Sequence, residues 1–146
     1  MSMRAYTHLA ASLTLYLTLA KLRLLTWDVS PLLAMAAGSL APDVDRYRSL
    51  LSRLIPLKHR GALHSLAGAA AASVVIALTL RAPYLPLFFA LGYLSHLALD
   101  SLTPMGVAWL SPIYSHRVRG PVKVGSLTEH LAFLFLAASS ALMLVL

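Results

Sequence analysis

Residues 84–102, YLPLFFALGYLSHLALDSL, form an apolar stretch that carries a histidine and an aspartate near its end. Its length is close to the roughly 20 residues that a helix needs to cross a bilayer. His96 and Asp100 stand four positions apart, so on a helix both side chains project from one face. Ionisable groups at membrane depth are costly and mark functional sites. The stretch therefore predicts a membrane helix that contributes two polar groups to a site.

The chain as a whole is also strongly apolar. Of its 146 residues, 59% are hydrophobic and 12% are charged, whereas a soluble domain averages about 25% charged residues. We therefore expect an integral membrane protein with an all-α fold, and the length fits one domain over residues 1–146. The expected helices are the apolar stretches at residues 5–20, 30–41, 63–80, 84–102 and 127–146.

The second stretch is shorter than the other expected helices. Ser30 is expected as its N-cap, Pro31 as its first-turn proline and Pro42 as its stop. We therefore predict a helical bundle of about five segments, with four spans and a second helix that is short or re-entrant.

The basic residues predict the orientation of these segments. They concentrate in two loops, and the positive-inside rule places both in the cytoplasm, with the N-terminus inside and the C-terminus outside an inner (plasma) membrane. In a membrane protein, the formal charge of +7 indicates attraction to anionic headgroups and not to nucleic acid. The two loops carry Arg46, Arg48, Arg53, Lys58 and Arg60, and Arg117, Arg119 and Lys123.

Within the first basic loop, apolar residues recur at helical spacing between arginines. This pattern favours a short amphipathic helix in the membrane interface. A loop helix packed on the rest of the protein explains it equally well. The apolar positions are Tyr47, Leu50, Leu51, Leu54 and Ile55.

The chain has no cysteine, so a metal site must use histidine and carboxylate ligands. His96 and Asp100 can reach one ion from adjacent turns of a helix. Taken alone, this pair is more simply explained as a hydrogen bond at a helix end. The other candidate ligands decide between these interpretations, because the predicted topology brings them to the same cytoplasmic side.

Four of these candidates lie around the first basic loop. In an extended chain the side chains of Asp43 and Asp45 lie on the same side, so they can share one ion, although either could instead cap a following helix. His59 and His64 flank Gly61 where the loop enters residues 63–80. Five positions do not place two histidines on one helical face, and exposed histidines beside arginines are the simpler explanation for this pair.

Two further candidates come from the first and last helices. His8 lies about one turn inside the first stretch, where a polar group needs a partner. Glu129 follows Ser126 by three residues, which is a capping-box pattern. Glu129 could therefore cap the last helix and still face the site.

Together these strings resemble a known family of small membrane-bound metal-dependent hydrolases, called YdjM-like or LexA-regulated. The resemblance covers most of the chain. It rests on YTHLAAS (6–12), SLAPDVD (39–45), HRGALHS (59–65), GYLSHLALDSLTPMGVAWLSP (92–112) and GSLTE (125–129). It implies a metal-dependent hydrolase that is similar to zinc-dependent phospholipase C in its His/Asp pattern.

The residues and the resemblance together predict a hydrolase of a lipid or lipid-linked phosphoester at the cytoplasmic face. The expected cofactor is one to three divalent ions, with zinc favoured by imidazole and carboxylate ligands. We expect Glu129 or Asp45 as the catalytic base, and Arg60 and Arg117 as phosphate-binding residues, although positive-inside charge also explains the arginines. The expected metal ligands are His8, Asp43, Asp45, His59, His64, His96 and Asp100.

Two other functions use the same residues. A metal-ion or proton-coupled transporter would need ligands near the bilayer midplane and a path to the far side. A non-catalytic membrane protein would use the cluster as a polar network or as a closed structural metal site.

Overall fold

The computed structural model describes residues 3–25, 27–45, 62–80 and 82–145. The described residues form α-helices and two 3₁₀ helices with no strand, which confirms the predicted all-α fold. A single backbone bridge joins Val107 to Val118. The predicted interfacial helix at residues 47–55 lies outside the described residues. The elements are α1 (Ala5–Lys21), α2 (Val29–Leu40), η1 (Ala41–Asp45), η2 (Ala62–His64), α4 (Leu66–Thr79), α5 (Leu85–Ser101) and α6 (Leu127–Val145).

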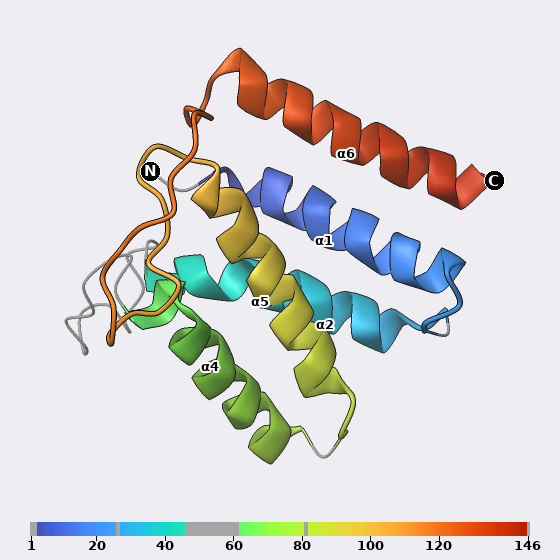
Figure 1. The fold of residues 1–146 in the computed structure, drawn as a ribbon. Helices are drawn as coiled ribbons and strands as arrows, with labels where there is room; N and C mark the ends of the chain where they lie inside the picture. The colour runs from blue at the N-terminus through green and yellow to red at the C-terminus, as the bar shows by residue number, and fades with distance from the viewer. Residues whose placement is uncertain (1–2, 26, 46–61, 81, 146) are drawn as a thin grey trace.

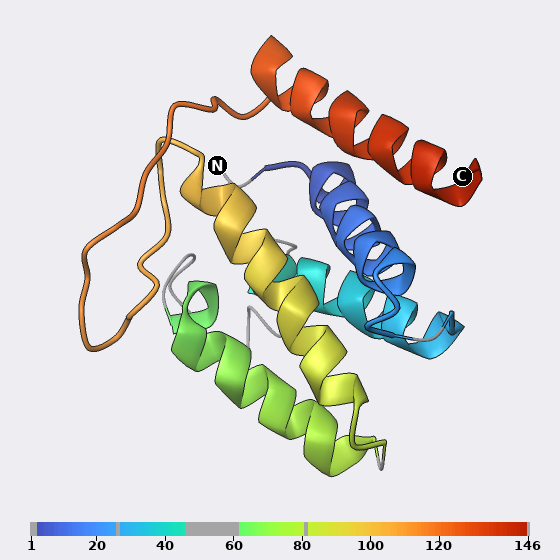
Figure 2. The ribbon, with the colours of Figure 1, turned by 45° about the vertical axis from the view of Figure 1, so that its right-hand side comes forward.

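Helix α5 occupies the middle of the bundle. It packs against α2 most extensively and also against α4 and α1, while α6 packs against α1. Figures 1 and 2 show α4 on one side of α5 and α1 on the other, with α2 crossing behind α5 and α6 outermost beside α1. The N-terminal segment lies beside the last turn of α5, so this end of the bundle gathers segments from both halves of the chain (Figure 1).

Two glycines allow α2 and α5 to approach closely. A Cβ atom on Gly38 would lie 2.0 Å from the backbone oxygen of Phe89, and one on Gly92 would lie 2.0 Å from the backbone oxygen of Met35. Because real Cβ atoms do not come this close to backbone atoms, any larger residue would push the helices apart. The contact matters for the site, since His96 follows Gly92 by one helical turn and Ser39 follows Gly38 directly.

Helix α2 begins earlier than the sequence predicted. Asp28, not Ser30, is the N-cap, and its carboxylate accepts hydrogen bonds from the backbone N–H and the hydroxyl of Ser30, at 3.1 and 2.9 Å. The predicted Ser30 cap is therefore wrong, because an aspartate two residues upstream already caps the helix. Pro42 does mark its end, since α2 stops at Leu40 and the chain continues as η1.

The segment between α5 and α6 folds back onto the end of α5. Thr103 accepts hydrogen bonds at its carbonyl from the backbone N–H groups of Gly106 and Gly120, at 3.0 and 3.1 Å. The indole N–H of Trp109 donates to the hydroxyl of Ser101 at 2.8 Å. These bonds hold the segment against the last turn of α5, which carries Asp100.

Among the described helices, α6 alone has the length and composition to cross a membrane, with 19 residues. Helices α1, α2, α4 and α5 have 17, 12, 14 and 17 residues, which is short of the roughly 20 that span a typical bilayer. The predicted bundle of four spans and the predicted orientation therefore stay predictions.

Candidate metal centre

Five of the predicted ligands meet at one end of the bundle. They come from four elements: His8 from α1, Asp43 from η1, His64 from η2, and His96 and Asp100 from α5. All five are buried, and none is more than 4% exposed. The structure thus brings together side chains that are up to 92 positions apart in the sequence (100 − 8). Burying this many polar groups is costly unless they bind a partner.

Asp100 lies among the three histidines. Its Oδ1 is 3.6 Å from His8 Nε2, and its Oδ2 is 3.6 Å from His96 Nε2 and 4.0 Å from His64 Nε2. Asp43 lies against two of the same rings, with Oδ1 3.4 Å from His64 Nε2 and 3.9 Å from His96 Nε2. Every histidine of the cluster therefore has a carboxylate oxygen within 4.0 Å.

These separations suit ligands of a shared ion. Zinc bonds to nitrogen and oxygen are about 2.0–2.2 Å long, which places two ligand atoms of one ion about 3–4 Å apart. Two sets of three side chains have ligand atoms within 4.8 Å of one another: His8, Asp43 and His96, and His64, His96 and Asp100. Both sets use His96, and its Nδ1 is bonded to a carbonyl, so its Nε2 can bind one ion and the geometry favours a single ion.

The orientation of His96 is set by a backbone group. Its Nδ1 lies 2.7 Å from the carbonyl oxygen of Ser39. A carbonyl can only accept, so Nδ1 carries a proton and donates, and in the neutral ring that binds a metal Nε2 carries the lone pair. That Nε2 has no hydrogen-bond partner among the described residues. Metal-ligating histidines usually have this arrangement, in which a second hydrogen bond fixes the ring and its tautomer.

His8 adds a second histidine nitrogen with no hydrogen-bond partner. Its ring is fully buried and stacks on that of His96, with ring centroids 3.8 Å apart. Neither Nδ1 nor Nε2 of His8 forms a hydrogen bond with a described residue. Buried imidazole nitrogens without partners are rare, because each forfeits about 1–3 kcal/mol of hydration. A metal ion at this position would supply the missing interaction, so the residues present fit a metal.

The N-terminal segment also contacts the cluster. Met3 donates its backbone N–H to Asp100 Oδ1 at 2.9 Å in a fully buried contact. The next residue, Arg4, donates its backbone N–H to Glu129 Oε1 at 2.7 Å. The start of the chain is therefore fixed between a candidate ligand on α5 and the first turn of α6.

Glu129 is buried but does not join the metal cluster. Its Oε2 accepts the backbone N–H of Gly125 at 2.5 Å, and its Oε1 accepts the N–H of Arg4 and lies 3.4 Å from the hydroxyl of Thr7. The carboxylate thus satisfies N–H groups at the starts of α6 and α1. The predicted capping box is shifted, because Glu129 reaches Gly125 and the hydroxyl of Ser126 donates to Lys123 O.

For the remaining predicted site residues, the structure describes the surroundings of Arg117 alone. Arg117 lies half-buried in the segment between α5 and α6. Asp45 ends η1, but the position of its side chain is outside the described part of the structure. His59 and Arg60 also lie outside the described residues. The sequence analysis did not identify Met3 and Ser39, because both act through backbone groups, which a pattern of side chains does not reveal.

Comparisons with known proteins identify the family of this fold and site. The family model described as YdjM inner membrane protein matches residues 3–146. No curated protein and no solved structure matches the chain, so the similarity to zinc-dependent phospholipase C stays a prediction. The match runs over nearly the whole length and includes all five clustered residues. The chain belongs to the YdjM inner membrane protein family.

Proposed function

We propose that this inner membrane protein is a metal-dependent hydrolase of a lipid or lipid-linked phosphoester. One observation carries the proposal: three histidines and two aspartates lie buried together, with nitrogen–oxygen separations of 3.4–4.0 Å. The donor set contains imidazole and carboxylate and no thiolate, which favours zinc among the common divalent ions. When bound, such an ion supplies a nucleophile from water near neutral pH and polarises a phosphoryl oxygen.

The residues of the chain have separate roles in this proposal. One of the two three-residue sets of the cluster, each of which contains His96, would hold the ion and leave a position open for water. The Ser39 carbonyl would keep His96 Nε2 directed at the ion. Among the predicted bases, Glu129 already accepts backbone N–H groups through both oxygens, which favours a positioning role. The base role then falls to Asp45, the last residue of η1.

The membrane and the position of the cluster support the proposed substrate class. The ligands come from the start of α1 and the last turns of α5 and not from the middles of these helices. A site near helix ends is at the depth where a lipid presents its phosphoester, and Arg117 in the adjacent segment could bind the phosphate. The basic loops support a cytoplasmic location for this end. His59 and Arg60 remain candidates for the same roles.

A structural metal site is the second candidate, and complete burial of the cluster favours it. Five protein donors would fill the coordination of an ion and leave no position for water, as in closed structural zinc sites. A catalytic site must instead leave a position open, which either three-residue set would do. Full metal occupancy without turnover of any phosphoester would support this candidate. Metal flux into proteoliposomes without turnover would support the transporter.

The test combines elemental analysis with a phosphoester screen on detergent-purified protein. The His96→Gln/Asp100→Asn double variant removes two ligands with little change in volume. The matched control is His116→Gln/Asp28→Asn, which alters the same residue types at exposed positions. We expect a stoichiometric divalent ion and hydrolysis in the wild type and the control, and neither in the ligand variant. Equal metal and turnover in the wild type and a folded ligand variant would disprove the proposal.

A further inference from the structure

Helices α1 and α6 meet along a polar seam. Thr14 Oγ1 lies 2.9 Å from Ser140 Oγ and 3.1 Å from the carbonyl oxygen of Leu136. Thr18 Oγ1 lies 3.7 Å from Met143 Sδ and donates to the carbonyl of Thr14 at 2.8 Å. Hydrogen bonds of this kind hold helices together in lipid, where apolar contacts give no hydrophobic driving force.

Beside this seam runs an apolar groove of about 410 Å³. It opens to the outside of the bundle, because α6 packs on α1 and leaves a large part of its own surface exposed, including Phe135 at 72%. In an inner membrane protein, that surface is in contact with acyl chains. The residues that shape the groove are Tyr6, Leu9 and Leu13 on α1 and Phe133, Ala137 and Leu144 on α6.

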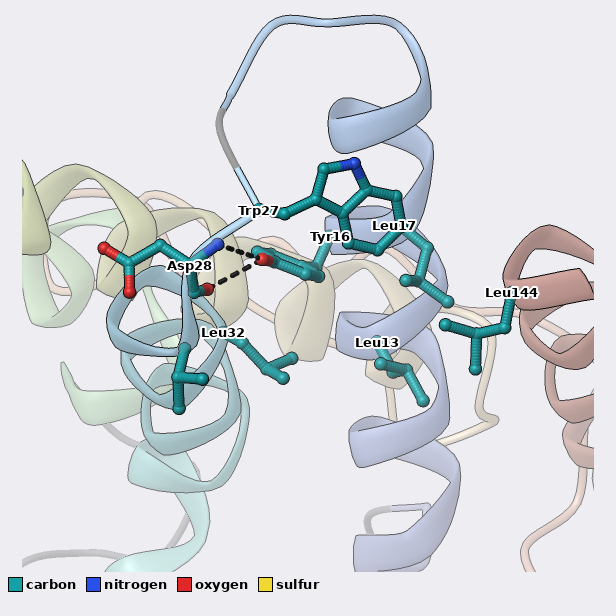
Figure 3. A pocket seen from close by; sticks show the side chains of 8 residues that line it. Leu13, Tyr16, Leu17, Trp27, Asp28, Leu32 and Leu144 are labelled. Carbon is teal, nitrogen blue, oxygen red and sulfur yellow. Dashed lines mark hydrogen bonds between the residues drawn. The ribbon is translucent and has the colours of Figure 1, made fainter.

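The groove continues beyond Leu13 and Leu144. These two residues also line a second apolar pocket of about 390 Å³, which extends past Leu17 to Trp27. Figure 3 shows Leu13 and Leu144 facing each other from the two helices, with Tyr16 and Trp27 beyond them. The hydroxyl of Tyr16 closes this end by bonding to the backbone of Asp28, at 2.7 and 3.0 Å. The two pockets thus form one elongated apolar surface along α1.

The opposite end of the groove is cationic. Tyr6 packs edge-on against Phe133 with ring centroids 4.8 Å apart, and its hydroxyl accepts a hydrogen bond from Arg4 Nη1 at 3.1 Å. The Arg4 side chain is exposed and forms no ion pair with a described residue. A guanidinium has five N–H donors, and the fork they form matches a phosphate. Four donors remain after the bond to Tyr6.

We propose that this groove binds an anionic phospholipid, with an acyl chain between α1 and α6 and the phosphate on Arg4. A long apolar surface with one cation at one end complements a molecule with a long apolar tail and one anionic group. A partner helix would match the apolar part but would leave Arg4 without a counter-ion. The site is formed by the face of α1 that carries Tyr6, Leu9 and Leu13 and does not depend on the proposed hydrolysis.

Native mass spectrometry of the full chain, purified with equimolar phosphatidylglycerol and phosphatidylcholine, tests the proposal. Arg4→Gln should lower the preference for phosphatidylglycerol about fivefold, the effect of about 1 kcal/mol for one basic residue near anionic lipid. Arg4→Lys should keep most of the preference. Ala137→Trp fills the groove and should abolish retention of either lipid.

Matched controls separate the site from general surface effects. Arg119→Gln removes an exposed arginine elsewhere, and Ala71→Trp adds the same bulk to an exposed position on α4. Both should bind lipid as the wild type does. Equal phosphatidylglycerol preference in Arg4→Gln and Arg119→Gln would overturn the proposal, as would equal retention in Ala137→Trp and Ala71→Trp. A lipid-free dimer that Ala137→Trp disrupts would also overturn it and would assign the groove to a second copy of the chain.

Discussion

Gly38 and Gly92 both lie at the crossing of α2 and α5, and each would place a Cβ atom 2.0 Å from a backbone oxygen of the other helix. The crossing thus requires glycine at both positions, because a Cβ atom on either residue would collide with the other helix. It sets the distance between the end of α2, with Ser39 and η1, and the turn of α5 that carries His96. The metal cluster is therefore assembled by a helix contact that contains no ligand.

Gly92→Ala should separate the two helices and damage the cluster. Overpacking a tight contact costs about 1–3 kcal/mol, and the upper end applies here because the clash is with backbone. We expect a lower melting temperature and, in the protein that remains folded, weaker metal binding, since the Ser39 carbonyl moves away from His96. Thermal unfolding and metal titration measure the two effects. A variant with unchanged stability and metal affinity would show that the helices do not approach this closely.

Removing the metal should destabilise the wild type. An ion that is present at a free concentration of 100 times its Kd and binds only the folded state raises the free energy of unfolding by about 2.7 kcal/mol. A chelator should therefore lower the melting temperature by several degrees. The His96→Gln/Asp100→Asn variant should not respond, because its site is already lost. Differential scanning fluorimetry with and without chelator gives this comparison, and an equal shift in both proteins would place the ion elsewhere.

Glu129→Ala should cost about 1–3 kcal/mol of stability, because it removes the charged acceptor of the part-buried N–H groups of Arg4 and Gly125. It should also weaken metal binding, since Arg4 adjoins Met3, which holds Asp100. Glu129→Gln keeps one acceptor oxygen and should recover part of both.

Turnover separates this positioning role from catalysis by Glu129. If Glu129 only positions other groups, activity should follow metal content across the wild type and both variants. If Glu129 is the catalytic base, the Glu129→Gln variant should keep its metal and its stability but lose turnover. The pH profile gives a second readout, because removal of a base would abolish its acidic limb.

The cap of α2 should give the protein a pH-dependent stability. The backbone N–H of Ser30, and then its hydroxyl, hold the pKa of Asp28 below its usual range. A depressed pKa means that the stabilisation is present above the unfolded value of about 3.9 and is lost as the pH falls through the folded value. Asp28→Ala should therefore melt below the wild type at pH 7, and the difference should shrink below about pH 4. A constant difference from pH 7 to pH 3 would contradict this origin.

The placement of the helices could be predicted well from the sequence, because apolar stretches bounded by proline and polar residues are local features. The pairing of His96 with Asp100 followed in the same way from helix geometry. The start of α2 was misplaced because Ser30–Pro31 is a good local cap, and only the structure shows that Asp28 caps the helix. The contacts between helices join residues far apart in the sequence. The pattern of apolar residues along the chain therefore did not predict that α6 packs on α1.

The side chains of the site could be predicted from the sequence, but the backbone groups that hold them in place could not. His8, Asp43 and His64 were candidates because imidazole and carboxylate are unusual in an apolar chain. The Ser39 carbonyl and the Met3 N–H could not be identified, since backbone groups are common to all residues and gain a role through position alone. The predicted dual role of Glu129 was ambiguous for a related reason: a carboxylate that caps two helices and one that serves a site have the same sequence pattern.

The hydrogen bond from Met3 to Asp100 has a practical consequence for recombinant work. An affinity tag fused ahead of Met3 would place its linker beside a buried carboxylate of the candidate centre, where bulk or a histidine run could displace or imitate a ligand. Helix α6 instead runs away from this end of the bundle toward Val145 (Figure 1). If the tag is placed at that end and removed before elemental analysis, the measured metal content can be assigned to the protein itself.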